Sequence, residues 1–455
     1  MSEGIIKEKQ GTVPNGRQEI KQPLVTGGAV VNYRDSWRIF RIIAEFVDGY
    51  QFLAELNKEI VILGSARLPS NNKYNKIAVE LGRLLGKNGF TTITGGGPGI
   101  MEAANKGAYE AGGESVGLNI QLPFEQRISP YVKKAIAFYY FFTRKTMLTS
   151  PANAFVFFPG GFGTLDEFFE VVDNIELGFM KRSPIVLVGS DFWKPIVEFV
   201  RNKSSKEVGS VPGSEIDEWK IVDTASDAFE YLKDIEDRPN VCEATDIENP
   251  LCEGGADWRV FRIMAELVDG FEFISKVKEN VTVLGTKSIK QDSKYYNQAY
   301  LVGKELAMGG YATMTGGGPG TMEAASKGAF ENGGESIGIN MRFSHGKERH
   351  NDYLTDSIGF FFPYIRKLII TSPSKGFVYF PGGFGTMHQL FEILTLQETG
   401  KIEKIPTLLY GKDFWQPMLD IIDNLYSEFK TISKDNIDLI KLIDKPEDVL
   451  GNIEK

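Results

Sequence analysis

Cysteine and histidine are scarce in this 455-residue chain, which holds two of the first and three of the second. Cys242 and Cys252 lie in an acidic stretch, where two free thiols in a reducing cytosol are favoured over a disulfide between them. His345, His350 and His388 show no metal-ligand spacing and have no cysteine partners. The sequence therefore predicts no zinc site and no other metal site.

Long apolar runs and a surplus of positive charge are also missing. No segment approaches the length of a membrane span, and the N-terminus lacks the apolar core of a signal peptide, so we expect a cytoplasmic protein without a membrane partner. The 51 Lys and Arg residues against 60 Asp and Glu residues give a net charge of −9, which argues against a nucleic-acid partner. A small phosphorylated ligand is not excluded, because a few backbone N–H groups and one Arg are enough to hold it.

What the chain does contain is an internal repeat. The hexapeptide PGGFGT occurs at residues 159–164 and again at 381–386, which is 222 positions later. A period above 200 residues indicates two domains, not the stacked units of a solenoid. We predict a mobile N-terminal tail (1–30), a first domain (31–236), a linker (237–255) and a second domain (256–455).

Short apolar strands alternate with helices in each repeat. The repeat opens with an amphipathic helix that carries Trp37, Phe40, Ala44 and Val47 on one apolar face. In the first repeat the strands are expected at 60–63, 91–94, 115–119, 154–158 and 185–188, and two further helices at 74–87 and 100–111. The alternation predicts an α/β fold of two Rossmann-like, three-layer α/β/α domains, each with a parallel sheet covered on both faces.

Two glycine-rich turns in each repeat lead from a strand into a helix. In the first repeat they are Gly95–Gly99 and residues 159–164, and both would lie at the carboxyl edge of one sheet. Unpaired N–H groups and the helix dipole make such a turn an anion site, whereas a single turn of this kind would indicate only tight backbone geometry. Four turns in one chain favour a phosphate cradle. The GxGxxG spacing and the P-loop pattern are absent, so nicotinamide chemistry and NTP hydrolysis are disfavoured.

The two PGGFGT turns are followed by different residues at the third position after the threonine. Thr164 is followed by Glu167, and Thr386 is followed by Gln389. Both pairs fit a capping box, in which the threonine caps the helix and the Glu or Gln reaches back to the cap N–H. Only Glu167 can also hold a negative charge, and the helix dipole should favour its ionised form. The first repeat can therefore perform acid–base chemistry that the second cannot.

An Arg-Lys pair stands fifteen residues before each PGGFGT turn, at Arg144-Lys145 and at Arg366-Lys367. An Arg there suits a phosphate or a ribose hydroxyl, and an ordinary surface ion pair explains the spacing equally well. Aromatic runs precede both pairs, at 138–142 and 360–362. These rings are expected in the core, with one ring free to touch a base.

Four segments of the first repeat together resemble the LOG (Lonely Guy) family. They are GGGPGIMEAANKGA (95–108), LPFEQ (122–126), Arg144-Lys145 and PGGFGTLDE (159–167). Members of this family were often labelled "lysine decarboxylase" but act as nucleoside 5′-monophosphate phosphoribohydrolases. The resemblance implies a Rossmann-like fold without a redox cofactor or other cofactor. It also implies cleavage of the N-glycosidic bond of a nucleoside 5′-monophosphate substrate, which gives free base and ribose 5-phosphate. The substrate can be a cytokinin-type nucleotide or an ordinary purine or pyrimidine nucleotide.

The resemblance assigns roles to residues of this chain. Arg144 and Glu167 are the implied catalytic pair, and the turn from Gly160 to Thr164 is the implied phosphate cradle. The implied substrate-binding residues are Ser65, Gly96, Gly97, Glu102, Asn119, Glu125, Lys145, Gly160, Gly161, Gly163, Thr164 and Asp173. A second, degenerate site is expected around Arg366, Gly382, Gly383, Gly385, Thr386 and Gln389.

The chain departs from the family pattern in both repeats. The family tends to have Thr where the first repeat has Asp173, while the second repeat keeps Thr395 at that position. Family members are commonly homodimers with sites near the subunit interface, so a tandem chain can form an intramolecular pseudo-dimer, which can pair further. We expect an active first domain and a degenerate second one. The alternatives are a nucleotide or molybdenum-cofactor carrier without catalysis, and DNA binding, which conflicts with the acidic balance.

Overall fold

The structure is a computed structural model that describes residues 33–121, 129–236, 255–342, 351–372 and 374–453. The predicted N-terminal tail, most of the predicted linker and both cysteines lie outside the described residues. The domain boundaries stay a prediction. No helix within the described ranges is both long enough and apolar enough to cross a membrane.

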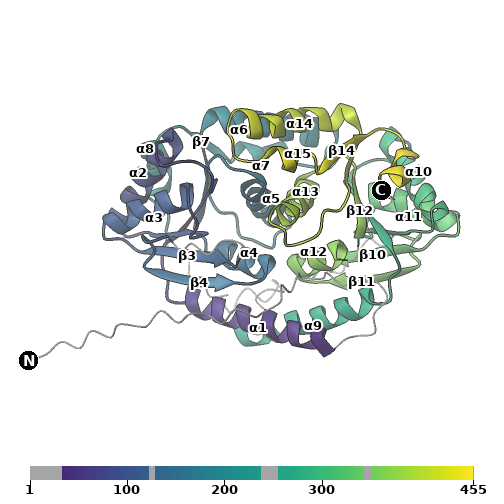
Figure 1. The fold of residues 1–455 in the computed structure, drawn as a ribbon, viewed down its shortest axis with the longest axis horizontal. Coiled ribbons are helices and arrows are strands. Elements are labelled where there is room, and N and C mark those ends of the chain that lie inside the picture. The colour runs from purple at the N-terminus through teal and green to yellow at the C-terminus, as the bar shows by residue number, and fades with distance from the viewer. Residues whose placement is uncertain (1–32, 122–128, 237–254, 343–350, 373, 454–455) are drawn as a thin grey trace, which may run out of the picture.

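Each repeat folds around a seven-stranded, all-parallel sheet covered by helices, which confirms the predicted fold class (Figure 1). The strand order of the first sheet is β4-β3-β2-β1-β5-β6-β7, and the second sheet repeats it as β11-β10-β9-β8-β12-β13-β14. The chain therefore moves outward from β1 in one direction and then crosses back to β5 on its other side. In parallel sheets the carboxyl ends of the strands at such a reversal are where ligands bind.

The first repeat contains β1 (Glu59–Leu63), β2 (Thr91–Thr94), β3 (Ser115–Ile120), β4 (Lys134–Phe138), β5 (Ala154–Phe157), β6 (Ile185–Val188) and β7 (Lys220–Val222). Its helices are α1 (Tyr33–Leu53), α2 (Lys73–Lys87), α3 (Ile100–Glu110), α4 (Phe141–Thr149), α5 (Phe162–Glu176), α6 (Ser190–Phe199), the π-helical η1 (Val200–Glu207), α7 (Gly213–Asp217) and α8 (Ala225–Leu232). The strands expected from the sequence are all present, within one residue at either end.

The second repeat contains β8 (Asn280–Leu284), β9 (Ala312–Thr315), β10 (Ser336–Met341), β11 (Asp356–Phe360), β12 (Ser374–Tyr379), β13 (Thr407–Tyr410) and β14 (Ile440–Ile443). Its helices are α9 (Gly255–Ile274), α10 (Lys294–Met308), α11 (Thr321–Glu331), α12 (Pro363–Thr371), α13 (Phe384–Glu398), α14 (Lys412–Ser427), α15 (Lys434–Ile437) and α16 (Asp448–Ile453).

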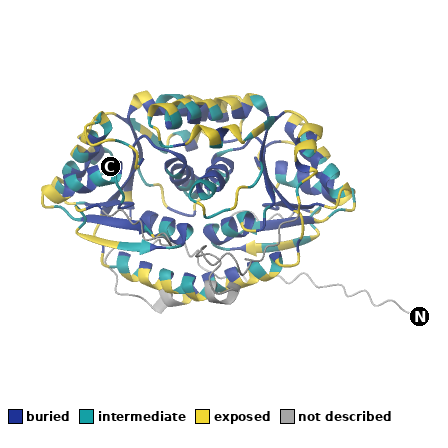
Figure 2. Ribbon diagram, turned by 180° about the vertical axis from the view of Figure 1, so that it is seen from behind, coloured by how far each residue is buried: buried dark blue, intermediate teal, exposed yellow. Residues whose placement is uncertain are grey.

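Helix α1 buries a different face from the one that its apolar pattern suggested. Trp37 and Phe40 are 59% and 61% exposed, whereas Ile39, Ile42 and Phe46 are buried. The helix carries two apolar stripes, and α1 lies beside α9 beneath the two sheets, so only one stripe can face inward (Figures 1 and 2). Which stripe that is depends on how the helix docks, which helical periodicity alone does not specify.

The two repeats share one hydrophobic core. Helices α5 and α13 pack against each other between the sheets, and buried residues of both repeats belong to the same contiguous cluster (Figure 1). Phe169 of α5 stacks on Phe391 of α13 with ring centroids 5.6 Å apart and planes 2° from parallel. Stacked aromatic pairs of this kind add to the stability gained by burial. The chain thus forms the predicted pseudo-dimer within itself, with α5 and α13 as its axis.

Candidate active site

The carboxyl ends of β1, β2 and β5 bring three loops of the first repeat together. Ser65, just after β1, donates its N–H to the carbonyl of Pro159 at 3.0 Å and accepts the N–H of Ile100 at 3.0 Å. Pro159 opens the PGGFGT turn after β5, and Ile100 begins α3 after the Gly95–Gly99 turn. The two glycine-rich turns therefore meet at one edge of the sheet. We call the residues around them the first site.

Glycine is required at two positions of these turns. Gly96 has φ +67°, and a side chain there would overlap the amide oxygen of Asn119. A side chain on Gly160 would overlap the hydroxyl of Thr164. Asn119 thus packs on the first turn and Thr164 on the second, where the sequence placed them.

The capping box that the sequence allows does not form. Helix α5 begins at Phe162, and the cap position is occupied by Gly161, which has no side chain to cap the helix. Because the helix starts two residues before Thr164, that threonine lies within the first turn and cannot cap it. Thr386 stands in the same place in α13, which begins at Phe384. Capping therefore does not explain why Glu167 follows the turn.

Glu167 instead faces Arg144 of α4. The guanidinium Nη1 lies 3.4 Å from the carboxylate Oε1, and both side chains are largely buried. Arg144 is oriented by its Nε, which donates to the carbonyl of Leu118 at the end of β3 at 2.7 Å. The two implied catalytic residues, which are 23 positions apart in sequence, are thus an ion pair beside the PGGFGT turn.

Burial shifts the pKa of both partners of this ion pair. It raises the pKa of Glu167 above its ordinary value, while the charges of Arg144 and Lys145 oppose the rise. The helix dipole was expected to favour the ionised form, and that expectation is wrong in direction because removing a carboxylate from water outweighs it. Burial also lowers the pKa of Arg144, and Glu167 opposes this change.

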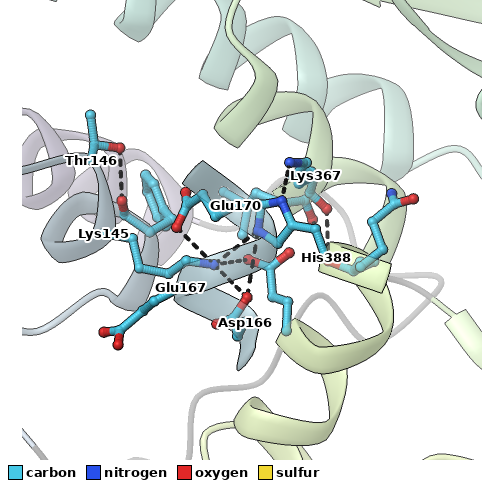
Figure 3. A network of polar contacts seen from close by, with 12 residues as sticks. Lys145, Thr146, Asp166, Glu167, Glu170, Lys367 and His388 are labelled. Carbon is cyan, nitrogen blue, oxygen red and sulfur yellow. Dashed lines mark hydrogen bonds and ion pairs between the residues drawn. The ribbon is translucent and has the colours of Figure 1, made fainter. Parts of the chain in front are cut away.

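Lys145 does not lie in the first site, although it follows Arg144 directly. Its side chain is 2% exposed and points into the interface between the repeats (Figure 3). Its Nζ lies 2.9 Å from Asp166, 3.3 Å from Glu170 and 3.4 Å from Glu392 of the second repeat. Burial alone would lower the pKa of Lys145, but these three carboxylates raise it well above its ordinary value. Lys145 is therefore a structural cation at the pseudo-dimer axis.

The equivalent lysine of the second repeat, Lys367, has different charged and polar partners. Lys367 bonds to Asp173 of the first repeat at 2.9 Å and contacts the ring of His388, which lies between the two lysines (Figure 3). Burial lowers the pKa of His388, and the two ammonium groups lower it further, which favours the neutral ring. His388 occupies the position that corresponds to Asp166 in the first repeat. Lys367 thus pairs with a carboxylate of the other repeat, whereas Lys145 pairs with two carboxylates of its own repeat and one of the other.

Asp173 belongs to the second repeat's turn, not to the first site. A side chain placed on Gly385 would come within 3.0 Å of an Asp173 carboxylate oxygen. In the reciprocal position, a side chain on Gly163 would lie 3.7 Å from the methyl group of Thr395. Each PGGFGT turn is therefore flanked by the other repeat's helix. The departure from the family pattern at Asp173 affects the second turn, and the first turn keeps its threonine.

The second repeat brings three residues to the first site that the sequence did not predict there. Thr395 is 3% exposed, and its hydroxyl has no hydrogen-bond partner among the described residues. The carbonyl of Thr431 lies 2.8 Å from where the Cβ of a side chain on Gly161 would be. The carboxylate of Glu398 accepts a hydrogen bond from the guanidinium of Arg67 at 2.6 Å. The retained threonine was a usable signal, because an interface site in a duplicated chain must draw residues from both copies.

The remaining predicted residues are placed as follows. Ser65 is buried and its hydroxyl accepts the N–H of Arg67 at 3.0 Å. Glu102 lines a groove with Arg67 and Lys106. Glu125 lies outside the described residues. Among the described residues, no group of three or more His, Cys, Asp and Glu side chains is placed to hold a metal ion.

Comparison with known proteins finds one family in both repeats. The model of the family described as "Possible lysine decarboxylase" matches residues 101–232 and 322–453. A rice (Oryza sativa subsp. japonica) protein named cytokinin riboside 5′-monophosphate phosphoribohydrolase LOG is 33% identical over 144 residues, which are 31% of this chain and 58% of the rice protein. A Rhodococcoides fascians protein named cytokinin riboside 5′-monophosphate phosphoribohydrolase is 24% identical over 151 residues, covering 32% of this chain and 75% of that protein.

Solved structures with a similar fold cover a single repeat's length. The molybdenum cofactor binding protein from Rippkaea orientalis is 23% identical, with a TM-score of 0.32, over 40% of this chain and 98% of its own. The molybdenum cofactor carrier protein from Chlamydomonas reinhardtii is 25% identical, with a TM-score of 0.30, over 39% of this chain and 96% of its own.

Proposed function

The chain belongs to the family described as possible lysine decarboxylases, and we propose that its first site hydrolyses the N-glycosidic bond of nucleoside 5′-monophosphates. The products are the free base and ribose 5-phosphate. The observation that carries the proposal is the buried ion pair of Arg144 and Glu167, 3.4 Å apart beside the PGGFGT turn. The names of the rice and Rhodococcoides relatives support the same substrate class.

The parts of the first site suit the steps of this reaction. The 5′-phosphate binds at the N-terminus of α5, where free N–H groups and the helix dipole attract an anion. Water forms a bond to C1′ as the bond from C1′ to the base nitrogen breaks, and the electron pair leaves with the base. Glu167 in its ionised form stabilises the oxocarbenium-like centre and takes the proton that water loses, while the base gains one. Arg144 keeps the carboxylate in place and offers its remaining donors to the substrate.

A decarboxylase of the pyridoxal type does not fit the lysines of the site. Such an enzyme needs a lysine amine that is free to form a Schiff base. Lys145 is held by three carboxylates and Lys367 by Asp173 and His388, both deep in the interface. These ammonium groups are structural, so the phosphoribohydrolase reaction is the better account of the site.

The direct test is product release from a panel of nucleoside monophosphates. The purified chain is incubated with AMP, GMP, CMP, UMP and an N6-substituted adenosine monophosphate of the cytokinin type. Free base and ribose 5-phosphate are then separated by chromatography, and we expect both in equal amounts from at least one substrate. Tight nucleotide binding by calorimetry without any release would contradict hydrolysis and support a carrier.

We expect Thr395→Val to raise KM about 10-fold while changing kcat little. The hydroxyl of Thr395 is buried near the phosphate cradle and has no hydrogen-bond partner among the described residues. A hydrogen bond to a charged group contributes roughly 1.5–3 kcal/mol. Steady-state kinetics on the best substrate gives both constants. Thr399→Val, at the C-cap residue that follows α13, is the matched control and should leave KM unchanged. An unaltered KM in Thr395→Val would remove the second repeat from the first site.

We expect the acid limb of kcat/KM to lie above pH 4.5, the ordinary pKa of a glutamate, because burial raises the pKa of Glu167. The ionised carboxylate is the active form, so activity is lost as the pH falls through that raised pKa. Rates between pH 4 and 9 test this. The pH dependence of inhibition by ribose 5-phosphate corrects for ionisation of the ligand's own phosphate. A limb at or below pH 4.5 would mean that another group limits the rate.

A further inference from the structure

A cavity of about 590 Å³ opens at the second repeat's PGGFGT turn. Residues of both repeats line it, among them Asp173, Lys287, Arg366, Thr386 and Gln389. We call it the second cavity. It lies at the same sheet edge in the second repeat as the first site does in the first. Its size is within the range of pockets that hold small organic ligands.

The backbone of the second cavity keeps the anion-binding form of the first site. Gly383 has φ −101° and ψ −153°, against −93° and −155° for Gly161, and both precede a 15-residue helix. Gly320, before α11, has φ 73° and ψ −126°, close to the 71° and −128° of Gly99 before α3. Arg366 is fixed as Arg144 is, with its Nε donating to the carbonyl of Ile339 at 2.7 Å. The duplication has therefore preserved the cradle.

Two donor side chains of the second cavity, Gln389 and Arg366, are incompletely paired among the described residues, although Arg366 donates to the carbonyls of Ile339 and Gly316. Gln389 is 6% exposed, lines the cavity, and its Nε2 has no hydrogen-bond partner among the described residues. Arg366 forms no ion pair with any described side chain, whereas Arg144 is paired with Glu167. A buried donor without a partner is costly unless a ligand or solvent satisfies it. The unpaired amide of Gln389 and the guanidinium of Arg366, which has no carboxylate partner among the described residues, call for an acceptor that an anionic ligand supplies.

The charges that line the second cavity agree with this. Arg366, Lys287 and Lys367 contribute three positive charges, while Asp173 and Glu176 contribute two negative ones. Asp173 faces Gly385 of the cradle, but Lys367 holds its carboxylate at 2.9 Å. That carboxylate should weaken phosphate binding relative to the first site, where Thr395 stands instead. A net positive lining still attracts a dianion.

We infer that the second cavity binds a nucleoside 5′-monophosphate and does not hydrolyse it. The ligand class rests on the function proposed above, because the two cradles share their backbone. Its phosphate lies between the N-terminus of α13 and Arg366, and Gln389 donates where Glu167 would act as a base. An amide cannot take a proton from water, so the bound nucleotide is retained intact. The chain thus has one catalytic site and one binding site for the same class of molecule.

Calorimetry with AMP tests this in the full chain carrying Glu167→Gln, in which turnover is blocked and both sites keep their shape. We expect two AMP molecules per chain. Adding Arg366→Met should reduce the number to one, and adding Lys287→Glu should weaken the second site about 10-fold without touching any buried contact. Lys290→Glu, another exposed lysine in the same loop that does not line the cavity, is the matched control. One AMP per chain that persists in Arg366→Met would overturn the inference.

The proposed hydrolysis can fail without this inference failing, and Arg144→Met separates the two cases. A single AMP that is lost in Arg366→Met and kept in Arg144→Met supports the second cavity even if no substrate is hydrolysed. A single AMP that is lost only in Arg144→Met overturns the second cavity and leaves the first site intact. If Arg366→Met does not fold, the exposed Lys287→Glu variant decides the question alone.

Discussion

Release of free base and ribose 5-phosphate falls by a factor of about 10² to 10⁴ in Glu167→Gln, the range expected when a general base is lost. Glutamine keeps the size of the side chain and its hydrogen bond to Arg144, but it can neither hold a negative charge nor accept a proton. The fold already accepts glutamine at this place, since Gln389 is buried at the same position of α13. The variant should therefore melt at the wild-type temperature and still bind AMP.

Glu110→Gln is the matched control for that result. Glu110 lies in the same repeat, at the end of α3, and its exposed carboxylate pairs with Arg83 on the surface. Its rate should stay within about twofold of the wild type. Equal losses in both variants would move the chemistry away from Arg144 and Glu167. A Glu167→Gln enzyme that keeps full activity would show that a different group activates water.

Lys145→Met should lower the free energy of unfolding by about 3–5 kcal/mol, the usual effect of removing one partner from a buried ion pair. The substitution leaves Asp166, Glu170 and Glu392 in the interface without their shared cation. For domains of this size the corresponding fall in melting temperature is roughly 10 °C. Scanning calorimetry on wild type and variant measures it.

The size of this destabilisation and its pH dependence show whether it comes from loss of the lysine's charge or from loss of its packing. Lys367→Met, the equivalent change, leaves only Asp173 unpaired and should destabilise the chain less. The deficit of Lys145→Met should grow as the pH rises. Buried carboxylates without a cation have a raised pKa, so they are neutral at low pH and must carry charge at high pH. Equal deficits in both variants at every pH would mean that the lysine stems, not their charges, stabilise the interface.

The sequence was sufficient for the sheets and turns because these follow local rules. Strands of three to six residues and glycine-rich turns occur at matching places in both repeats, so the pattern of one copy supports the prediction for the other. The face that α1 buries could not be predicted from such local patterns, because the helix has two apolar stripes. The start of α5 was also misplaced. Thr164 and Gly161 are both acceptable cap residues, and the structure has Gly161 at the cap.

Helical geometry explains why two predicted site residues lie elsewhere. Successive residues are about 100° apart around an α-helix, so Lys145 cannot face the same way as Arg144. Asp173 follows Glu167 by six positions, or about 240° around α5, and that face meets α13. This periodicity needs only the sequence, but it does not tell which turn Asp173 or Thr395 lies beside. What the sequence could not supply was the partner helix, because the contact between α5 and α13 joins residues more than 200 positions apart.

The fusion of the two copies has a genetic consequence. In a dimer of identical chains, any substitution on the central helix appears in both halves at once, so a change that alters one site must alter the other. Here position 173 and position 395 are encoded separately, and they hold Asp and Thr. One half holds a carboxylate where the other holds a threonine, and His388 stands in the second half where the first has Asp166. A single gene thus lets selection act on each half independently.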